Sequence, residues 1–162
     1  MKYFKISLAI LFFAGTFSAC SVSKEARGMR KNINGNWILQ TITTEGITGI
    51  VKTKIFNEAE FGCFIGSEWN FIKNNSMGSY NLVDKSKNCT PLKRSIRWSV
   101  FEPKDMPKEF QFKRLDDKNN TMDDGNGYRL IITELDDTHM KLRSDIVFEG
   151  KTAAIIYNFV SK

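Results

Sequence analysis

Histidine and cysteine are scarce in this sequence. Among its 162 residues there is one histidine, His139, and the three cysteines form no Cys-x-x-Cys pair. A structural zinc site needs about four His and Cys ligands, and a hydrolytic triad needs a base held beside a nucleophile. We therefore expect no metal, no cofactor and no catalytic residue, and the sequence does not predict an enzyme.

Long apolar runs and dense basic blocks are missing as well, and helix signals are few. The apolar stretch at residues 6–14 is shorter than the roughly 20 residues that span a bilayer. The formal net charge of +6 is spread along the chain, which gives no indication of a nucleic-acid partner. Only residues 54–61, KIFNEAEF, are predicted to form a short helix.

The first twenty residues have the layout of an export signal. Two lysines precede the apolar run, and the small residues Ser18 and Ala19 come directly before Cys20. This arrangement resembles the signal of bacterial lipoproteins, in which the cysteine becomes the first mature residue and carries acyl chains such as palmitate. The resemblance implies a signal peptide at residues 1–19 and a lipid bilayer as partner. An ordinary cleaved signal followed by an unmodified cysteine is the alternative.

Residues 20–34 are polar, basic and without periodicity, so they predict a flexible tether. Their basic side chains favour a mild attraction to an anionic membrane surface; these are Lys24, Arg27, Arg30 and Lys31. The predicted location is the cell envelope, lipid-anchored at the outer membrane, with the side of that membrane left open.

Cys63 and Cys89 remain as an even pair once Cys20 is acylated. Exported proteins fold in an oxidising compartment, where such a pair favours a disulfide. Closing a loop of this length would stabilise the fold by about 3–4 kcal/mol on the chain-entropy model. Two buried free thiols are the alternative.

Apolar and polar residues alternate with a period of two through most of the chain, which is typical of strands with one wet face. Short turn signals separate these runs. The clearest runs are residues 94–101, 109–114, 127–135, 138–148 and 152–160. With the strands that begin near residues 37, 50, 68 and 79, the count reaches eight or nine.

A meander of that size without covering helices must close on itself or expose two edges. An antiparallel up-and-down barrel of about eight strands solves this problem, and a two-sheet sandwich is the alternative. The predicted fold class is therefore all-β.

The first strand begins Gly35-Asn36-Trp37, which is similar to the G-x-W signature that opens the first strand of lipocalins. Later segments are similar to lipocalin-like lipoproteins of Gram-negative envelopes: CFIGSEWNFIKNN from Cys63, GSY at 78–80, IRWSV from Ile96, FQFK, GYRL and the final IIYNF. The resemblance covers residues 35–162 and implies a lipocalin-like barrel domain. Trp37 is then expected to plug one end of the barrel, with Gly35 allowing a tight turn beneath it.

The chain also supplies 13 phenylalanines, four tyrosines and three tryptophans, which are bulky enough to line a small barrel. For each inward candidate, packing in the core and contact with a ligand both stay open. The candidates are Trp69, Phe71, Tyr80, Trp98, Phe112, Tyr128 and Tyr157. The resemblance implies a binding module for a small apolar or amphipathic ligand. The alternative is an envelope scaffold with a solid barrel whose loops contact a protein or a glycan.

Overall fold

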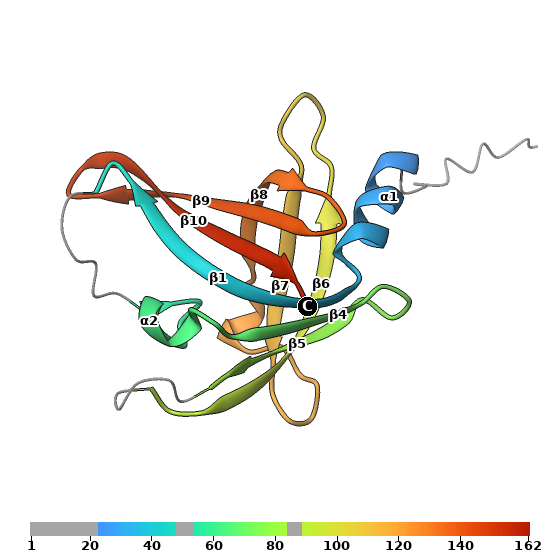
Figure 1. The fold of residues 1–162 in the computed structure, drawn as a ribbon, viewed down its shortest axis with the longest axis horizontal. Helices are drawn as coiled ribbons and strands as arrows, with labels where there is room; N and C mark the ends of the chain where they lie inside the picture. The colour runs from blue at the N-terminus through green and yellow to red at the C-terminus, as the bar shows by residue number, and fades with distance from the viewer. Residues whose placement is uncertain (1–22, 48–53, 84–88) are drawn as a thin grey trace, which may run out of the picture.

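Eight antiparallel strands close into one barrel in the order β1-β10-β9-β8-β7-β6-β5-β4 (Figure 1). The computed structural model describes residues 23–47, 54–83 and 89–162. The strands are β1 (Gly35–Glu45), β4 (Glu68–Ile72), β5 (Met77–Leu82), β6 (Leu92–Phe101), β7 (Glu109–Leu115), β8 (Tyr128–Leu135), β9 (His139–Phe148) and β10 (Lys151–Ser161). The predicted up-and-down barrel is confirmed, and the sandwich is excluded.

The period of two in the sequence decides which side chains face the interior. In β6 and β7, Trp98 lies opposite Phe112 and both are buried, whereas the next pair, Arg97 and Lys113, is exposed. Neighbouring residues of a strand point to opposite faces, so one face of each strand lines the core and the other meets solvent.

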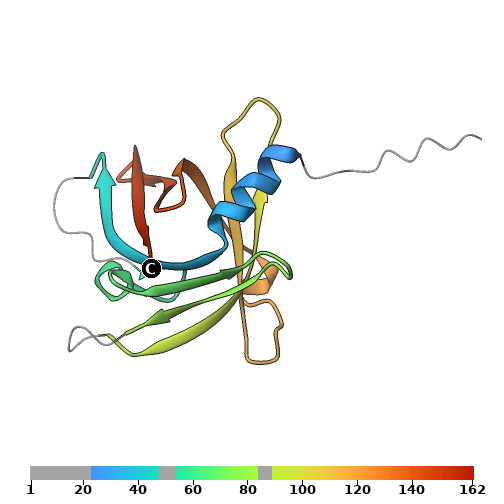
Figure 2. The same cartoon turned by 45° about the vertical axis from the view of Figure 1, so that its right-hand side comes forward.

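Strand β1 closes the barrel by bending between two partners. It pairs with β4 over Gly35–Ile38 and with β10 from Trp37 to Glu45, and its register shifts between Leu39 and Thr41. A bulge of this kind bends a strand and increases its twist. Figure 2 shows the resulting curve, in which β1 turns away from β4 and follows β10.

Helix α1 (Lys24–Ile33) replaces most of the predicted flexible tether. The Ser23 side chain caps it by accepting a hydrogen bond from the Ala26 N–H at 2.9 Å. The prediction of a flexible segment is wrong for residues 24–33, because they form a capped helix. The sequence gives little sign of this helix, since only Ala26 and Ile33 are buried. A helix with so narrow an apolar face depends on tertiary packing, here against β6 and β8 at one end of the barrel.

The predicted helix at residues 54–61 is also wrong. These residues form the two-stranded sheet of β2 (Lys54–Ile55) and β3 (Ala59–Glu60), and the helix α2 (Phe61–Phe64) begins only at the last of them. Phe56 and Asn57, in the turn, have φ angles of 52° and 49°, and this left-handed conformation interrupts a right-handed helix. We call residues 54–60 the lid hairpin.

A disulfide joins Cys63 in α2 to Cys89, ahead of β6, with a Cα–Cα distance of 5.4 Å. The predicted pairing is confirmed, and it fastens the segment after the lid hairpin to the barrel wall. The predicted signal peptide at residues 1–19 and Cys20 lie outside the described residues. Within the described ranges, no helix combines the length and the apolar character that crossing a bilayer requires.

Candidate functional site at the barrel mouth

The seven aromatic candidates all belong to the barrel interior, in one cluster. Six of them are almost fully buried, and Tyr128 is partly buried. Together with Phe110, which belongs to the same cluster, three of these rings form a continuous row. Trp98 lies near Phe110, Phe110 near Phe112, and Phe112 near Tyr128, with centroids 5.0–6.0 Å apart. The interior between these residues is therefore packed by aromatic rings.

One further ring enters this cluster from outside the barrel wall. Phe56, in the lid hairpin, is 7% exposed and stacks on Tyr157 with centroids 5.3 Å apart. It also meets Phe112 edge-on at 5.0 Å and Trp69 at 6.2 Å. Left-handed backbone in a bulky residue costs about 1–3 kcal/mol and persists where surrounding contacts enforce it. Phe56 thus closes the mouth of the barrel with a strained insertion.

A cluster of charged side chains surrounds this insertion. Arg94 of β6 lies opposite Tyr80 in the β5–β6 pairing and so faces the same side as that buried tyrosine. The Glu58 carboxylate accepts hydrogen bonds from Arg94 Nε at 2.9 Å and from Arg94 Nη2 at 3.0 Å. It also accepts from Tyr80 Oη at 2.7 Å and Arg114 Nη1 at 2.8 Å. Four donor atoms therefore converge on the carboxylate of Glu58, whereas Glu60, the other carboxylate of the lid hairpin, is exposed.

Arg114 of β7 is the most buried member of the cluster, at 5% exposure. Its Nε and Nη2 atoms donate to the two oxygens of Asp123, at 2.9 and 2.5 Å. Asp123 comes from the loop after β7 and also accepts from Tyr128 Oη at 3.1 Å. Two guanidinium groups and two carboxylates thus balance in charge, as buried ion clusters must.

The electrostatics of the cluster keep both carboxylates ionised. Burial by itself raises the pKa of Glu58, but the hydrogen bonds from Arg94, Tyr80 and Arg114 outweigh it, and the pKa lies below its ordinary value. The hydrogen bonds from Arg114 lower the pKa of Asp123. Burial raises the pKa of Tyr128 to about 12, so this hydroxyl stays a donor. Among the described residues, no buried side-chain nitrogen or oxygen is without a hydrogen-bond partner.

The opposite end of the barrel is closed by α1. The Trp37 indole N–H donates to the Ile33 carbonyl at 2.9 Å, and Gly35 precedes it with a φ of 134°, which suits glycine. Arg30 lies over the Trp98 ring at 5.2 Å and donates to Ser76 Oγ at 2.7 Å. Arg30, expected to face a membrane, is therefore engaged by the barrel itself.

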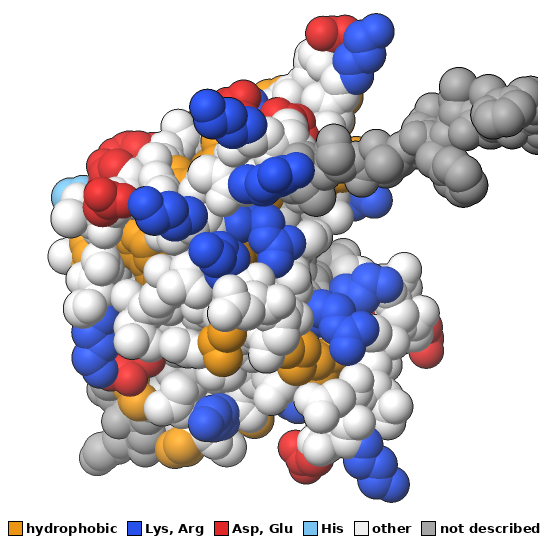
Figure 3. All heavy atoms as spheres, turned by 90° about the vertical axis from the view of Figure 1, so that its right-hand side faces the viewer, with side chains coloured by type: hydrophobic (Ala, Val, Ile, Leu, Met, Phe, Trp, Pro, Cys, Tyr) orange, Lys and Arg blue, Asp and Glu red, His pale blue; other side chains and the backbone are white. Residues whose placement is uncertain are grey.

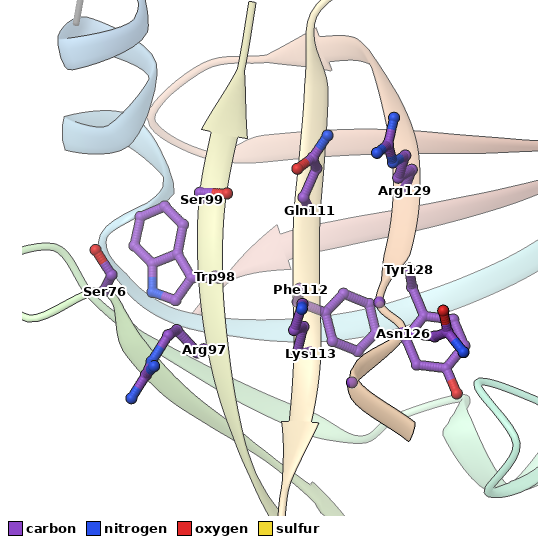
Figure 4. A pocket seen from close by; sticks show the side chains of 12 residues that line it. Ser76, Arg97, Trp98, Ser99, Gln111, Phe112, Lys113, Asn126, Tyr128 and Arg129 are labelled. Atoms are coloured by element: carbon purple, nitrogen blue, oxygen red, sulfur yellow. The ribbon is translucent and has the colours of Figure 1, made fainter. Parts of the chain in front are cut away.

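The outer wall carries a basic groove with a volume of about 510 Å³. Arg97, Lys113 and Arg129, from β6, β7 and β8, line it together with hydroxyl and amide side chains (Figure 4). More widely, Lys and Arg side chains gather on the face of the molecule that carries α1 (Figure 3). No group of three or more His, Cys, Asp or Glu residues suited to a metal ion occurs in the described part of the chain.

Sequence reasoning missed the residues that make the mouth distinctive: Phe56, Glu58, Arg94, Arg114 and Asp123. A signal for the two arginines was present, because the alternation that turns Trp98 and Phe112 inward also turns Arg94 and Arg114 inward. Glu58 and Phe56 carried no such signal, since their position depends on the left-handed turn.

Comparisons with known proteins assign no family to this chain. No family model matches the chain, and no curated protein sequence matches it. Among solved structures, a lipocalin-like protein from Bacteroides uniformis is 13% identical with a TM-score of 0.45, over 81% of this chain and 99% of that one.

Two further structures are similar at the same level. A bovine odorant-binding protein, a deswapped triple mutant, is 14% identical with a TM-score of 0.42, over 81% of this chain and 74% of that one. Apocrustacyanin C2 is 14% identical with a TM-score of 0.47, over 85% of this chain and 65% of that one. Likenesses this distant carry no inference about a ligand.

Proposed function

We propose that this protein is an envelope lipoprotein whose barrel binds a small apolar or amphipathic ligand. Residues 1–19 act as the signal peptide, acylated Cys20 anchors the chain to the outer membrane, and α1 links the anchor to the barrel. The protein acts as a binding module and not as an enzyme.

One observation carries the binding role: the mouth of an aromatic-lined barrel is covered by a short hairpin and not by its wall strands. The eight wall strands pair continuously around the barrel, whereas Phe56 reaches the interior from β2–β3, a separate two-stranded sheet. Displacing this hairpin would uncover Tyr157, Phe112 and Trp69 without breaking the barrel's own pairing. Ligand sites in small barrels are commonly found at such mouths.

Native mass spectrometry of the protein extracted from its own envelope tests the binding role. We expect an added mass of one small molecule in stoichiometric amount, lost when the protein is denatured. Two results together would exclude the proposal: the protein carries no such mass, and no member of a broad panel of apolar compounds displaces a neutral fluorescent probe from the barrel.

The anchor is tested separately by Cys20→Ser. This variant is expected to move from the membrane fraction to the soluble fraction while its barrel stays folded. Ser21→Ala is the matched control and should remain with the membrane. A Cys20→Ser protein that stays membrane-bound, or a wild-type protein without acyl mass, would contradict lipid anchoring.

The basic outer groove favours a second candidate function, an envelope scaffold that contacts an acidic protein or glycan. Exposed arginine and lysine from three adjacent strands, beside hydroxyl and amide groups, suit carboxylated or phosphorylated partners. Replacing Arg97 and Lys113 by Gln should then abolish capture of the partner, and the same change should leave binding in the barrel unaffected.

A further inference from the structure

The two inward arginines of the mouth place positive charge where a barrel interior is otherwise apolar. The side chain of Arg114 is 6% exposed and that of Arg94 is 16% exposed. Removing a guanidinium group from water is costly unless an anion pairs with it. Among the described residues of the barrel wall and its loops, one carboxylate pairs with these arginines, Asp123, which faces Arg114. Without the lid hairpin, these described side chains would carry one positive charge in excess.

The lid hairpin supplies the missing anion. Both oxygens of Glu58 are engaged by Arg94, through Nε at 2.9 Å and Nη2 at 3.0 Å. This paired contact is the geometry in which a guanidinium group recognises a planar carboxylate. Arg114 and Tyr80 complete the set of donors around the same group.

The same hairpin supplies an apolar body two residues earlier. The Phe56 ring lies among five other aromatic rings, with centroids 5.0–6.2 Å away. Phe56 and Asn57 both hold left-handed φ angles to achieve this. Together, Phe56 and Glu58 present an apolar ring and one carboxylate to the interior of the barrel.

We propose that Phe56 and Glu58 occupy the place of the ligand, and that the ligand is an amphipathic carboxylate whose head group replaces Glu58 between Arg94 and Arg114. This inference rests on the proposed binding function and adds the chemical class of the ligand. When the hairpin leaves, a carboxylate restores the charge balance, a neutral head group leaves one excess positive charge, and a cationic head group adds a second.

Matched ligands test the head group. The full chain carrying Cys20→Ser avoids detergent, and displacement of the neutral probe N-phenyl-1-naphthylamine reports occupancy of the barrel. We expect dodecanoate to bind at least tenfold more tightly than dodecanol. Dodecyl sulfate, tested in parallel, distinguishes recognition of a planar carboxylate from recognition of any anion. Equal affinities for dodecyl sulfate and dodecanoate would overturn the carboxylate assignment.

Matched variants test the built-in occupant. Glu58→Gln removes the competing carboxylate and so weakens the closed hairpin, which should raise the affinity for dodecanoate and for dodecanol by the same factor while the tenfold preference for dodecanoate is kept. Glu60→Gln, on the same hairpin but exposed, should change neither. Arg94→Gln should remove the preference for the acid, and Arg94→Lys, which keeps the charge but loses the paired contact, should restore part of it. A thermal melt of each variant confirms that it is folded.

The outcomes separate the two proposals. Equal binding of dodecanoate and dodecanol in wild type and in Glu58→Gln overturns the carboxylate inference and leaves the carrier function standing. Absence of binding by either ligand, in wild type and in the Phe56→Gly/Glu58→Gln double variant, overturns the carrier function itself.

Discussion

The two ends of the barrel are closed in different ways. At one end α1 lies across β6 and β8, with its first turn capped by Ser23 and with Arg30 bound to Ser76. At the other end the lid hairpin inserts Phe56 through a left-handed turn and places Glu58 between two arginines. The first closure uses favourable local geometry, and the second combines strain with buried charge.

Under the proposed binding function, this difference predicts that the mouth is the end that opens. A buried ion cluster stabilises little once the removal of its charges from water is counted, yet it is strongly destabilised when one partner is removed. Such a cluster therefore adds little stability to the closed mouth, and it can be replaced only by a ligand that restores its charge balance. Among the described residues, the helical end contains no buried ion cluster of this kind, so we expect it to stay closed while ligand exchanges at the mouth.

The largest expected effect is at the helical end. Trp98→Ala should lower the free energy of unfolding by about 3–5 kcal/mol, because removal of a buried indole leaves a cavity and the Met77 carbonyl loses the indole N–H that donates to it. Phe56→Gly, at the mouth, should cost less, since the hairpin can shift into the gap and glycine removes the left-handed strain. Urea unfolding measures both. Equal decreases in the free energy of unfolding for the two variants would contradict a difference between the two ends. Phe101→Ala, at an exposed position, is the control.

The disulfide should matter almost as much. Replacing Cys63 and Cys89 together by Ser should lower the free energy of unfolding by about 3–4 kcal/mol, since the bridge constrains a loop of 26 residues in the unfolded chain. Hydrogen exchange should quicken in the lid hairpin more than in α1, because only the mouth is fastened by this bridge. Reductant should lower the free energy of unfolding of the wild type by the same amount and leave that of the double variant unchanged. A decrease of less than about 1 kcal/mol in the double variant would contradict a stabilising role of the bridge.

Acid should weaken the mouth selectively. The pKa values of Glu58 and Asp123 are lowered by folding, so the unfolded chain binds more protons than the folded one in acid. Their stabilisation is fully present above the ordinary values, 4.5 and 3.8, and is lost as the pH falls through the lowered ones. Urea unfolding across this range should show a shallower loss for Glu58→Gln than for wild type. Glu60→Gln should follow wild type, and a wild-type profile that stays flat in acid would contradict the role of the cluster.

The smallest expected effect concerns the helix cap. Ser23→Ala should cost about 1 kcal/mol, because the Ala26 N–H loses the Ser23 oxygen. Ser23→Thr keeps the oxygen and should be close to neutral. If Ser23→Ala instead loosened the lid hairpin in hydrogen exchange, the two ends would be coupled and not independent.

The barrel could be predicted from the sequence because its signal repeats. Trp69, Phe71, Trp98 and Phe112 recur at alternate positions of separate strands, and each strand predicts the same inward face independently. Cysteine counting predicted the bridge for a similar reason, since Cys63 and Cys89 were the only pair left after Cys20 was assigned to the anchor.

The structure of the mouth could not be predicted because each of its features depends on a single residue and not on a repeated pattern in the sequence. KIFNEAEF has the composition of a helix, and only the aromatic rings of the assembled barrel hold Phe56 in its left-handed turn. Arg94 and Arg114 lie on the inward face by alternation, but a charged residue is ordinarily assigned to solvent. Their burial requires Asp123, which follows Arg114 by nine residues, and Glu58, which lies 36 residues from Arg94 and 56 from Arg114.

The sequence by itself determined the strands, the inward aromatic faces and the pairing of the cysteines, because each depends on local alternation or on simple counting. The tertiary structure alone decided how the two ends are closed. Helix α1 needs the assembled wall as its packing surface, and the carboxylate of residue 58 meets the guanidinium groups of residues 94 and 114 only in the folded chain. Long-range charge balance and enforced backbone strain exist in the folded chain and leave no periodic trace in the sequence.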